Sequence, residues 1–134
     1  MSRRRDRRHT FQLVFQIEFH TAEEMDECKA LFFQTLEDAE NLDQAFVEAA
    51  FLGVLQNKEK IDGLINQYAE GWGIDRIAKS DLAIIRLCVY ELLFRPEIPR
   101  SVAINEAVEL AKLFSTDEGP AFVNGVLAKI TANL

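Results

Sequence analysis

Three stretches near the end of the chain have the apolar spacing of α-helices and together form one block, residues 80–130. The first stretch, residues 82–94, is apolar except for Arg86, Tyr90 and Glu91. A helix that is apolar on nearly every side must be surrounded by protein or lipid, and this one is too short for a bilayer, which takes about 20 apolar residues. We therefore expect the central helix of a helical core, in which each polar residue needs a partner or a functional surface.

Helical spacing also predicts three regions before this block. Ser2 is a suitable N-cap for a first helix that ends at Phe19, and Thr21 begins a capping box that opens a second helix. A third region begins near Asp43 and bends or restarts at Asn57, where its apolar spacing is interrupted. The first half of the chain is thus expected to be helical as well.

Prolines and serines mark the ends of the later helices. Pro96 and Pro99 end the central helix, because proline cannot donate to a helix ladder. Ser80 and Ser101 are predicted to cap the helices on either side of these prolines, and Pro120 suits the first turn of a last helix. No stretch alternates apolar and polar residues as a strand does, so we predict an all-α fold.

The glycines on either side of Trp72 make the one strong internal break. We expect a single domain with an N-terminal sub-bundle (residues 1–72) and a C-terminal sub-bundle (residues 73–134). The chain of 134 residues, 49% of them hydrophobic, is long enough for one good core. Cys28 and Cys88 lie far apart and match no metal spacing, and no signal peptide is visible. We expect a cytoplasmic protein with two reduced thiols, no cofactor and no bound metal.

The charge is unevenly distributed. The net charge is −7, but five arginines and one Asp6 give residues 1–8 a charge of +4, which leaves −11 on the rest. Such an asymmetry indicates a basic end that binds a polyanion and an acidic body that limits indiscriminate binding.

The arginines at positions 3, 4, 7 and 8 share much of the apolar arc of the first helix, whereas Asp6 points away from it. We expect the first two turns to extend beyond the bundle as a rigid basic prong, because five arginines do not fit into a core. Guanidinium groups suit phosphates and stack on bases, which favours nucleic acid as the ligand. The alternatives are a solvated terminus, a protein partner and a membrane surface.

Catalysis finds little support in the sequence. His9 and His20 do not have the spacing of a carboxylate-bridged metal bundle. Glu106 and Glu109 lie one turn apart, but Lys112 continues the series and indicates an exposed charged ladder. We therefore predict that the protein is not an enzyme, with a metal-binding enzyme that uses Glu106 and Glu109 as a rival hypothesis.

Four segments together resemble the NusB family of transcription antitermination factors: RRRDRRHTFQLVFQ, DLAIIRLCVYEL, INEAVELAK and FVNGVL. The resemblance covers the whole chain in the family's order. It implies an all-α fold of about seven helices arranged as two packed three-helix sub-bundles. It also implies that the protein binds the single-stranded boxA element of nascent ribosomal RNA together with NusE, a small-subunit ribosomal protein. The complex would join RNA polymerase and other Nus factors and prevent premature termination.

The resemblance also assigns roles to individual residues. It places RNA binding at Arg3, Arg4, Arg5, Arg7, Arg8, Glu118 and Phe122. It places the surface for NusE at Phe15, Asp81, Arg86 and Glu91. The other interpretations remain open: Phe15 as core, Asp81 as a helix-start charge, and Arg86 as a buried partner of Glu91 or of a backbone carbonyl.

The chain departs from the family in three places. Phe15 replaces a frequent tyrosine, Ala121 a frequent basic residue, and Pro120 alters the start of the last helix. The differences at residues 120 and 121 weaken the RNA assignment for Glu118 and Phe122. A homodimer that masks the RNA surface stays possible, and a helical protein-interaction module without specific RNA binding is the alternative function.

Overall fold

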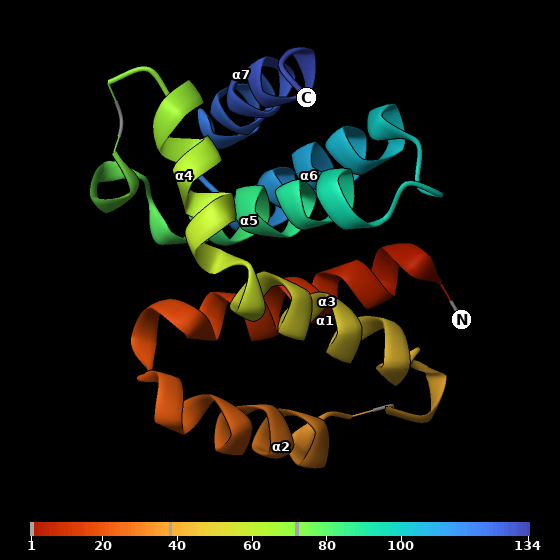
Figure 1. Cartoon of the computed structure of the whole chain (residues 1–134). Helices are drawn as coiled ribbons and strands as arrows, with labels where there is room; N and C mark the ends of the chain where they lie inside the picture. The colour runs from red at the N-terminus through yellow and green to blue at the C-terminus, as the bar shows by residue number, and fades with distance from the viewer. Residues whose placement is uncertain (1, 38, 72) are drawn as a thin grey trace.

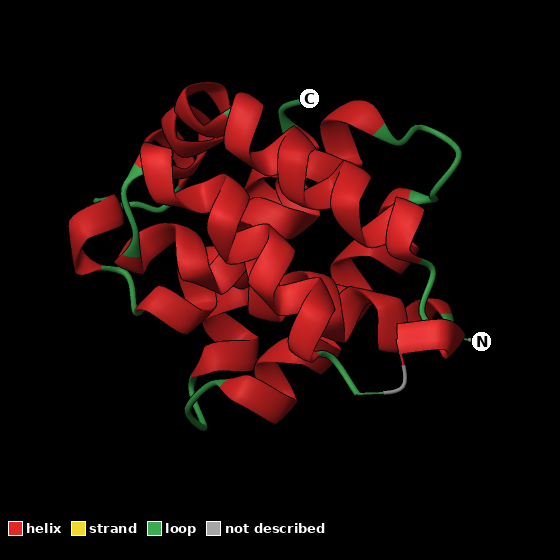
Figure 2. Cartoon of the chain, turned by 90° about the horizontal axis from the view of Figure 1, so that it is seen from below, coloured by secondary structure: helices red, strands yellow, loops and turns green. Residues whose placement is uncertain are grey.

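The computed structural model describes residues 2–37, 39–71 and 73–134, and these residues form helices joined by short loops (Figure 2). The seven α-helices of this described part are α1 (Arg3–Phe15), α2 (Met25–Thr35), α3 (Gln44–Gln56), α4 (Lys58–Tyr68), α5 (Lys79–Phe94), α6 (Arg100–Phe114) and α7 (Gly119–Ala132). Four 3-10 helices connect them: η1 (Gln16–Phe19), η2 (Ala22–Glu24), η3 (Ala39–Asn41) and η4 (Ile74–Arg76). The predicted all-α class is confirmed.

Helix α5 lies between two groups of helices, with α1, α2 and α3 below it and α4, α6 and α7 around and above it (Figure 1). Every residue of α5 from Asp81 to Glu91 is buried, as predicted for the central helix. Helix α1 packs on α3 and α5, and α6 packs on α5 and α7. The core is therefore built around the most apolar segment of the sequence.

Several predicted helix ends are confirmed. The side chain of Ser2 accepts a hydrogen bond from the backbone N–H of Arg5, and that of Asp43 accepts one from Phe46, so both are N-caps. Thr21 forms the predicted capping box with Glu24, α4 restarts after Asn57, and Pro120 lies in the first turn of α7.

Three helix ends differ from the prediction. The α-helical part of the first helix ends at Phe15 and continues as a 3-10 turn, because its last residues form tighter i→i+3 hydrogen bonds. Ser80 and Ser101 are not caps: α5 begins at Lys79 and α6 at Arg100, directly after Pro99. The two start positions differ from the prediction by one or two residues, the usual scale of error for helix ends, whereas the α-helical part of the first helix is four residues shorter than predicted.

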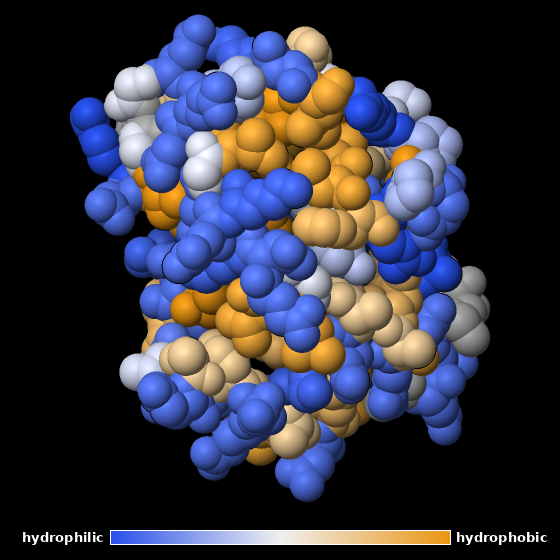
Figure 3. Space-filling view, viewed as in Figure 1, coloured by the Kyte–Doolittle hydropathy of each residue, from blue (hydrophilic) through white to orange (hydrophobic). Residues whose placement is uncertain are grey.

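Helix α4 packs on α5 and α7, so the described packing groups it with the C-terminal helices (Figure 1). The predicted break falls on Trp72, which lies outside the described residues, and a division into residues 1–72 and 73–134 stays a prediction. Figure 3 shows polar residues over much of one face, with apolar patches between them. Among the described residues, none of the helices has both the length and the hydropathy to cross a bilayer.

Candidate nucleic-acid interface

The arginine-rich start of α1 is packed against the protein, which corrects the prediction of a free basic prong. Arg7 is buried, with only 7% of its side chain exposed. Its Nε and Nη2 donate to both carboxylate oxygens of Glu91 on α5 at 3.0–3.3 Å, and its Nη1 lies 3.9 Å from Glu106 on α6. The bidentate ion pair with Glu91 neutralises the charge of the Arg7 guanidinium, and this allows Arg7 to lie in the core.

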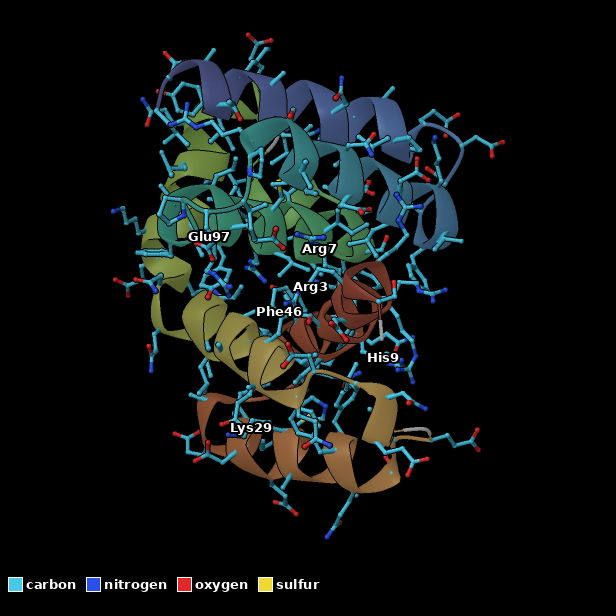
Figure 4. The ribbon with its side chains drawn as sticks, turned by 90° about the vertical axis from the view of Figure 1, so that its right-hand side faces the viewer. Arg3, Arg7, His9, Lys29, Phe46 and Glu97 are labelled. Atoms are coloured by element: carbon cyan, nitrogen blue, oxygen red, sulfur yellow. The ribbon has the colours of Figure 1, made fainter. Side chains whose placement is uncertain are left out.

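Arg3 and Asp6 form a second set of contacts, between α1 and α3. Asp6 is 2% exposed and accepts a hydrogen bond from the backbone N–H of Asp43 at 3.1 Å. Arg3 donates to Asp6 and Asp43, and its guanidinium lies 4.0 Å from the centre of the Phe46 ring. Figure 4 shows Arg3 and Phe46 together beside the start of α1. Asp6 thus points into the protein and not away from it.

Arg4 and Arg8 remain exposed, and Arg5 is half-buried. Arg4 donates through Nε to both oxygens of Glu106 at 3.0 and 3.3 Å. One helical turn further on, Arg8 lines a cavity of about 220 Å³ with residues of α6. The exposed charges of Arg4 and Arg8 are therefore directed toward α6, whereas the exposed Arg3 pairs with Asp43 at the start of α3.

Helices α1 and α6 run side by side in the same direction. Arg4 contacts Glu106 at one end, and the rings of Phe11 and Phe114 stack with centroids 4.7 Å apart at the other. We call the surface between these two contacts the α1–α6 seam; it carries Arg4, Arg8 and Lys112. Arg4 and Phe11 are seven positions apart on α1, which at a rise of 1.5 Å per residue corresponds to about 10 Å.

An aromatic patch continues the seam. It consists of Phe11, Phe15, Phe19 and Phe114, in which neighbouring rings lie 4.7–5.9 Å apart. Phe15 is half-buried, whereas 52% of Phe19 and 36% of Phe114 are exposed. Phe15 therefore belongs partly to the core and partly to a surface. Exposed aromatic clusters of this kind are typical of surfaces that bind a protein partner.

Asp81, Glu118 and Phe122 line one cavity of about 260 Å³. Asp81 accepts a hydrogen bond from Ser115 Oγ at 2.6 Å and is 7% exposed, so it does more than charge the start of α5. Gly119 permits this contact, because a Cβ there would lie 2.0 Å from Ser115 Oγ. Glu118 is exposed at the start of α7 and Phe122 is half-buried. The structure thus joins one residue predicted to contact NusE with two predicted to contact RNA.

Arg86 is buried in the interior, at 1% exposure. It donates to both oxygens of Asp62 on α4 at 2.8 and 2.9 Å and also to Glu18 in η1. The alternative that pairs Arg86 with Glu91 is therefore wrong, since Glu91 holds Arg7. Burial opposes the charge of Glu18, but Arg86 and Lys79 outweigh it and lower the pKa of that carboxyl below its usual value.

The groups considered for catalysis are engaged in ion pairs. Glu106 pairs with Arg4, and Glu109 accepts from Lys112 at 3.1 Å, as the charged ladder predicted. Within the described ranges, no three His, Cys, Asp or Glu side chains are grouped as metal ligands. Both cysteines are free, and burial raises the pKa of each thiol.

Two carboxylates that matter to this arrangement escaped sequence reasoning, Asp62 and Glu18. The available signal was Arg86 itself, because a cation in an all-apolar helix requires buried carboxylates. Asp62 lies between Ile61 and Ile65 on the buried face of α4, which is where such a partner has to be.

Comparison with known proteins identifies the family. The model of the NusB family matches residues 4–132. The chain belongs to the NusB family. Relatives named transcription antitermination protein NusB include that of Bacillus pumilus, 44% identical over 134 residues (100% of this chain, 98% of the relative). Another is that of Agathobacter rectalis, 42% identical over 129 residues (96% and 98%).

Solved structures agree with this assignment. NusB from T. maritima superposes with a TM-score of 0.83 at 35% identity and covers 98% of this chain and 92% of its own. A structure of antitermination factors NusB and NusE in complex with dsRNA has a TM-score of 0.76 at 23% identity, with full coverage of both chains. The latter likeness shows that the NusB fold is shared.

Proposed function

We propose that this NusB-family protein binds the single-stranded boxA element of nascent ribosomal RNA together with NusE. In the complex with RNA polymerase and other Nus factors, it prevents premature termination in the cytoplasm. The observation that carries the proposal is the α1–α6 seam, where exposed arginines lead directly into the aromatic patch. Its relatives carry the name of transcription antitermination proteins, which fits this role.

The arginines then divide into two groups. Arg4 and Arg8 neutralise RNA phosphates from the exposed side of α1, with Arg3 and Arg5 beside them, because guanidinium forks suit phosphate oxygens. Arg7 holds α1 against α5 through Glu91 and so fixes the direction of its exposed neighbours. Unstacked bases meet Phe122 and the polar edge of Glu118 at the cavity that these two residues line with Asp81.

The aromatic patch, which includes Phe15, receives NusE, and Asp81 belongs to the same partner surface. Arg86 and Glu91 support this surface from inside, since both are buried. Because the body of the protein is acidic, RNA binding is weak for the protein alone and tighter when NusE extends the surface. A homodimer through α1 would cover the seam and compete with RNA.

The test is a titration of boxA RNA and of a scrambled RNA of equal length, each with and without NusE. A preference for boxA that grows with NusE supports the proposal. Equal, weak binding of both RNAs in every mixture contradicts it and leaves a helical protein-interaction module.

A further inference from the structure

The cavity in the α1–α6 seam is lined by a lysine of α6 in addition to the N-terminal arginines of α1. Its cations are Arg4, Arg7 and Arg8 from α1 and Lys112 from α6. The charge of Arg7 is already met by Glu91 in the interior. The three remaining cations face two carboxylates, Glu106 and Glu109, so the cavity keeps an excess of positive charge.

Lys112 is free to change partners. Its side chain is 58% exposed, and its Nζ lies 3.1 Å from Glu109 Oε1, an exposed i,i+3 pair on the same helix. Pairs of this kind contribute little to stability and are easily exchanged for a stronger anion. Arg4, also 58% exposed, donates through its Nε to Glu106, and within the described residues its Nη groups make no further hydrogen bond that would prevent them from meeting another acceptor.

We propose that Lys112 is a further RNA-contacting residue, and that Arg4, Arg8 and Lys112 together hold RNA phosphate in the seam cavity. The site combines cations from two helices, which the packing of Phe11 on Phe114 keeps at a fixed separation. On binding, a phosphate oxygen replaces the Glu109 carboxylate on Lys112. The inference rests on the proposed function and adds a residue from α6 to the RNA site.

The test compares Lys112→Ala with Lys29→Ala in titrations of boxA RNA in the presence of NusE. Lys29 on α2 also pairs with a glutamate, Glu48 at 3.7 Å, but lies in the lower part of the molecule, away from Arg7 (Figure 4). A lost phosphate contact on single-stranded RNA lowers affinity about fivefold at 0.1 M salt and makes the log–log salt slope shallower by about 0.7. We expect this for Lys112→Ala, near-normal binding for Lys29→Ala, and recovery in Lys112→Arg.

Glu109→Gln provides a test with the opposite sign, because it frees Lys112 without removing it. We expect RNA affinity to rise about two- to fivefold, and no such rise when Lys112→Ala is also present. Thermal unfolding confirms that each variant is folded. If the unaltered protein shows no boxA preference, the proposed function fails. If it binds boxA while Lys112→Ala behaves like Lys29→Ala, the role of Lys112 alone is refuted.

Discussion

Replacing Glu91 with alanine removes the partner of the most deeply buried arginine of α1. Arg7 loses three hydrogen bonds of 3.0–3.3 Å, and its side chain, 7% exposed, remains in the interior with Glu106 at 3.9 Å as its nearest carboxylate. Breaking one partner of a buried ion pair costs about 3–5 kcal/mol. That is a large part of a typical unfolding free energy of about 5–15 kcal/mol.

Urea unfolding followed by circular dichroism measures this loss. We expect Glu91→Ala to lower the unfolding free energy by about 3–5 kcal/mol and the melting temperature by about 10–20 °C. Arg7→Met/Glu91→Leu should recover most of the loss, because apolar side chains of similar volume leave no buried charge. The exposed ion pair of Lys112 and Glu109 provides the control. Glu109→Ala should lower the unfolding free energy by less than about 1 kcal/mol. A Glu91→Ala protein within about 1 kcal/mol of the unaltered one would refute the burial of Arg7.

Two further predictions concern Gly119 and Glu18. Gly119→Ala should lower the unfolding free energy by about 1–3 kcal/mol, since its Cβ would meet Ser115 Oγ at 2.0 Å and Asp81 Oδ1 at 3.2 Å. Gly125→Ala, on the same helix with no atom within 4 Å of its Cβ, should be neutral or stabilising in the same urea titration. The pKa of Glu18 is lower in the folded protein than its ordinary value of 4.5, so the ionised carboxylate stabilises the fold at pH values above 4.5. This stabilisation is lost as the pH falls through the folded pKa and the carboxylate becomes protonated. The stability difference between the unaltered protein and Glu18→Gln should therefore shrink as urea titrations move from about pH 6 to about pH 3.

Each of these has a clear contrary result. Equal stability of Gly119→Ala and Gly125→Ala would mean that α7 does not approach Ser115 as closely as described. A constant difference for Glu18→Gln across the acid range would mean that Arg86 does not hold the Glu18 carboxylate in its charged form.

Local signals were enough to predict the helices. The Ser2 cap and the first-turn Pro120 act within three residues of the helix starts, so the sequence alone reveals them, as it does the helix start near Asp43. The apolar run of α5 likewise predicted the buried centre of the fold. The family resemblance added the expected fold and function, which periodicity does not contain.

The sequence did not predict which arginines would be buried. Arg7 meets Glu91 84 residues later, and Asp6 meets the backbone of Asp43 37 residues later. Helical periodicity describes only neighbours within a turn or two, so it assigned these charges to solvent. The same limit hid the contact of Arg86 with Asp62, and it left Lys112 in an exposed ladder although folding brings it to the arginines of α1.

The central claim is that the exposed arginines of α1 bind RNA phosphates. Its most direct test is the salt dependence of boxA RNA binding, in the presence of NusE, by the unaltered protein and by Arg4→Ala/Arg8→Ala. The account predicts that the double variant binds more weakly, with a log–log slope shallower by about 1.4, or about 0.7 for each lost contact. An unchanged affinity and slope would contradict it and place the RNA on another surface.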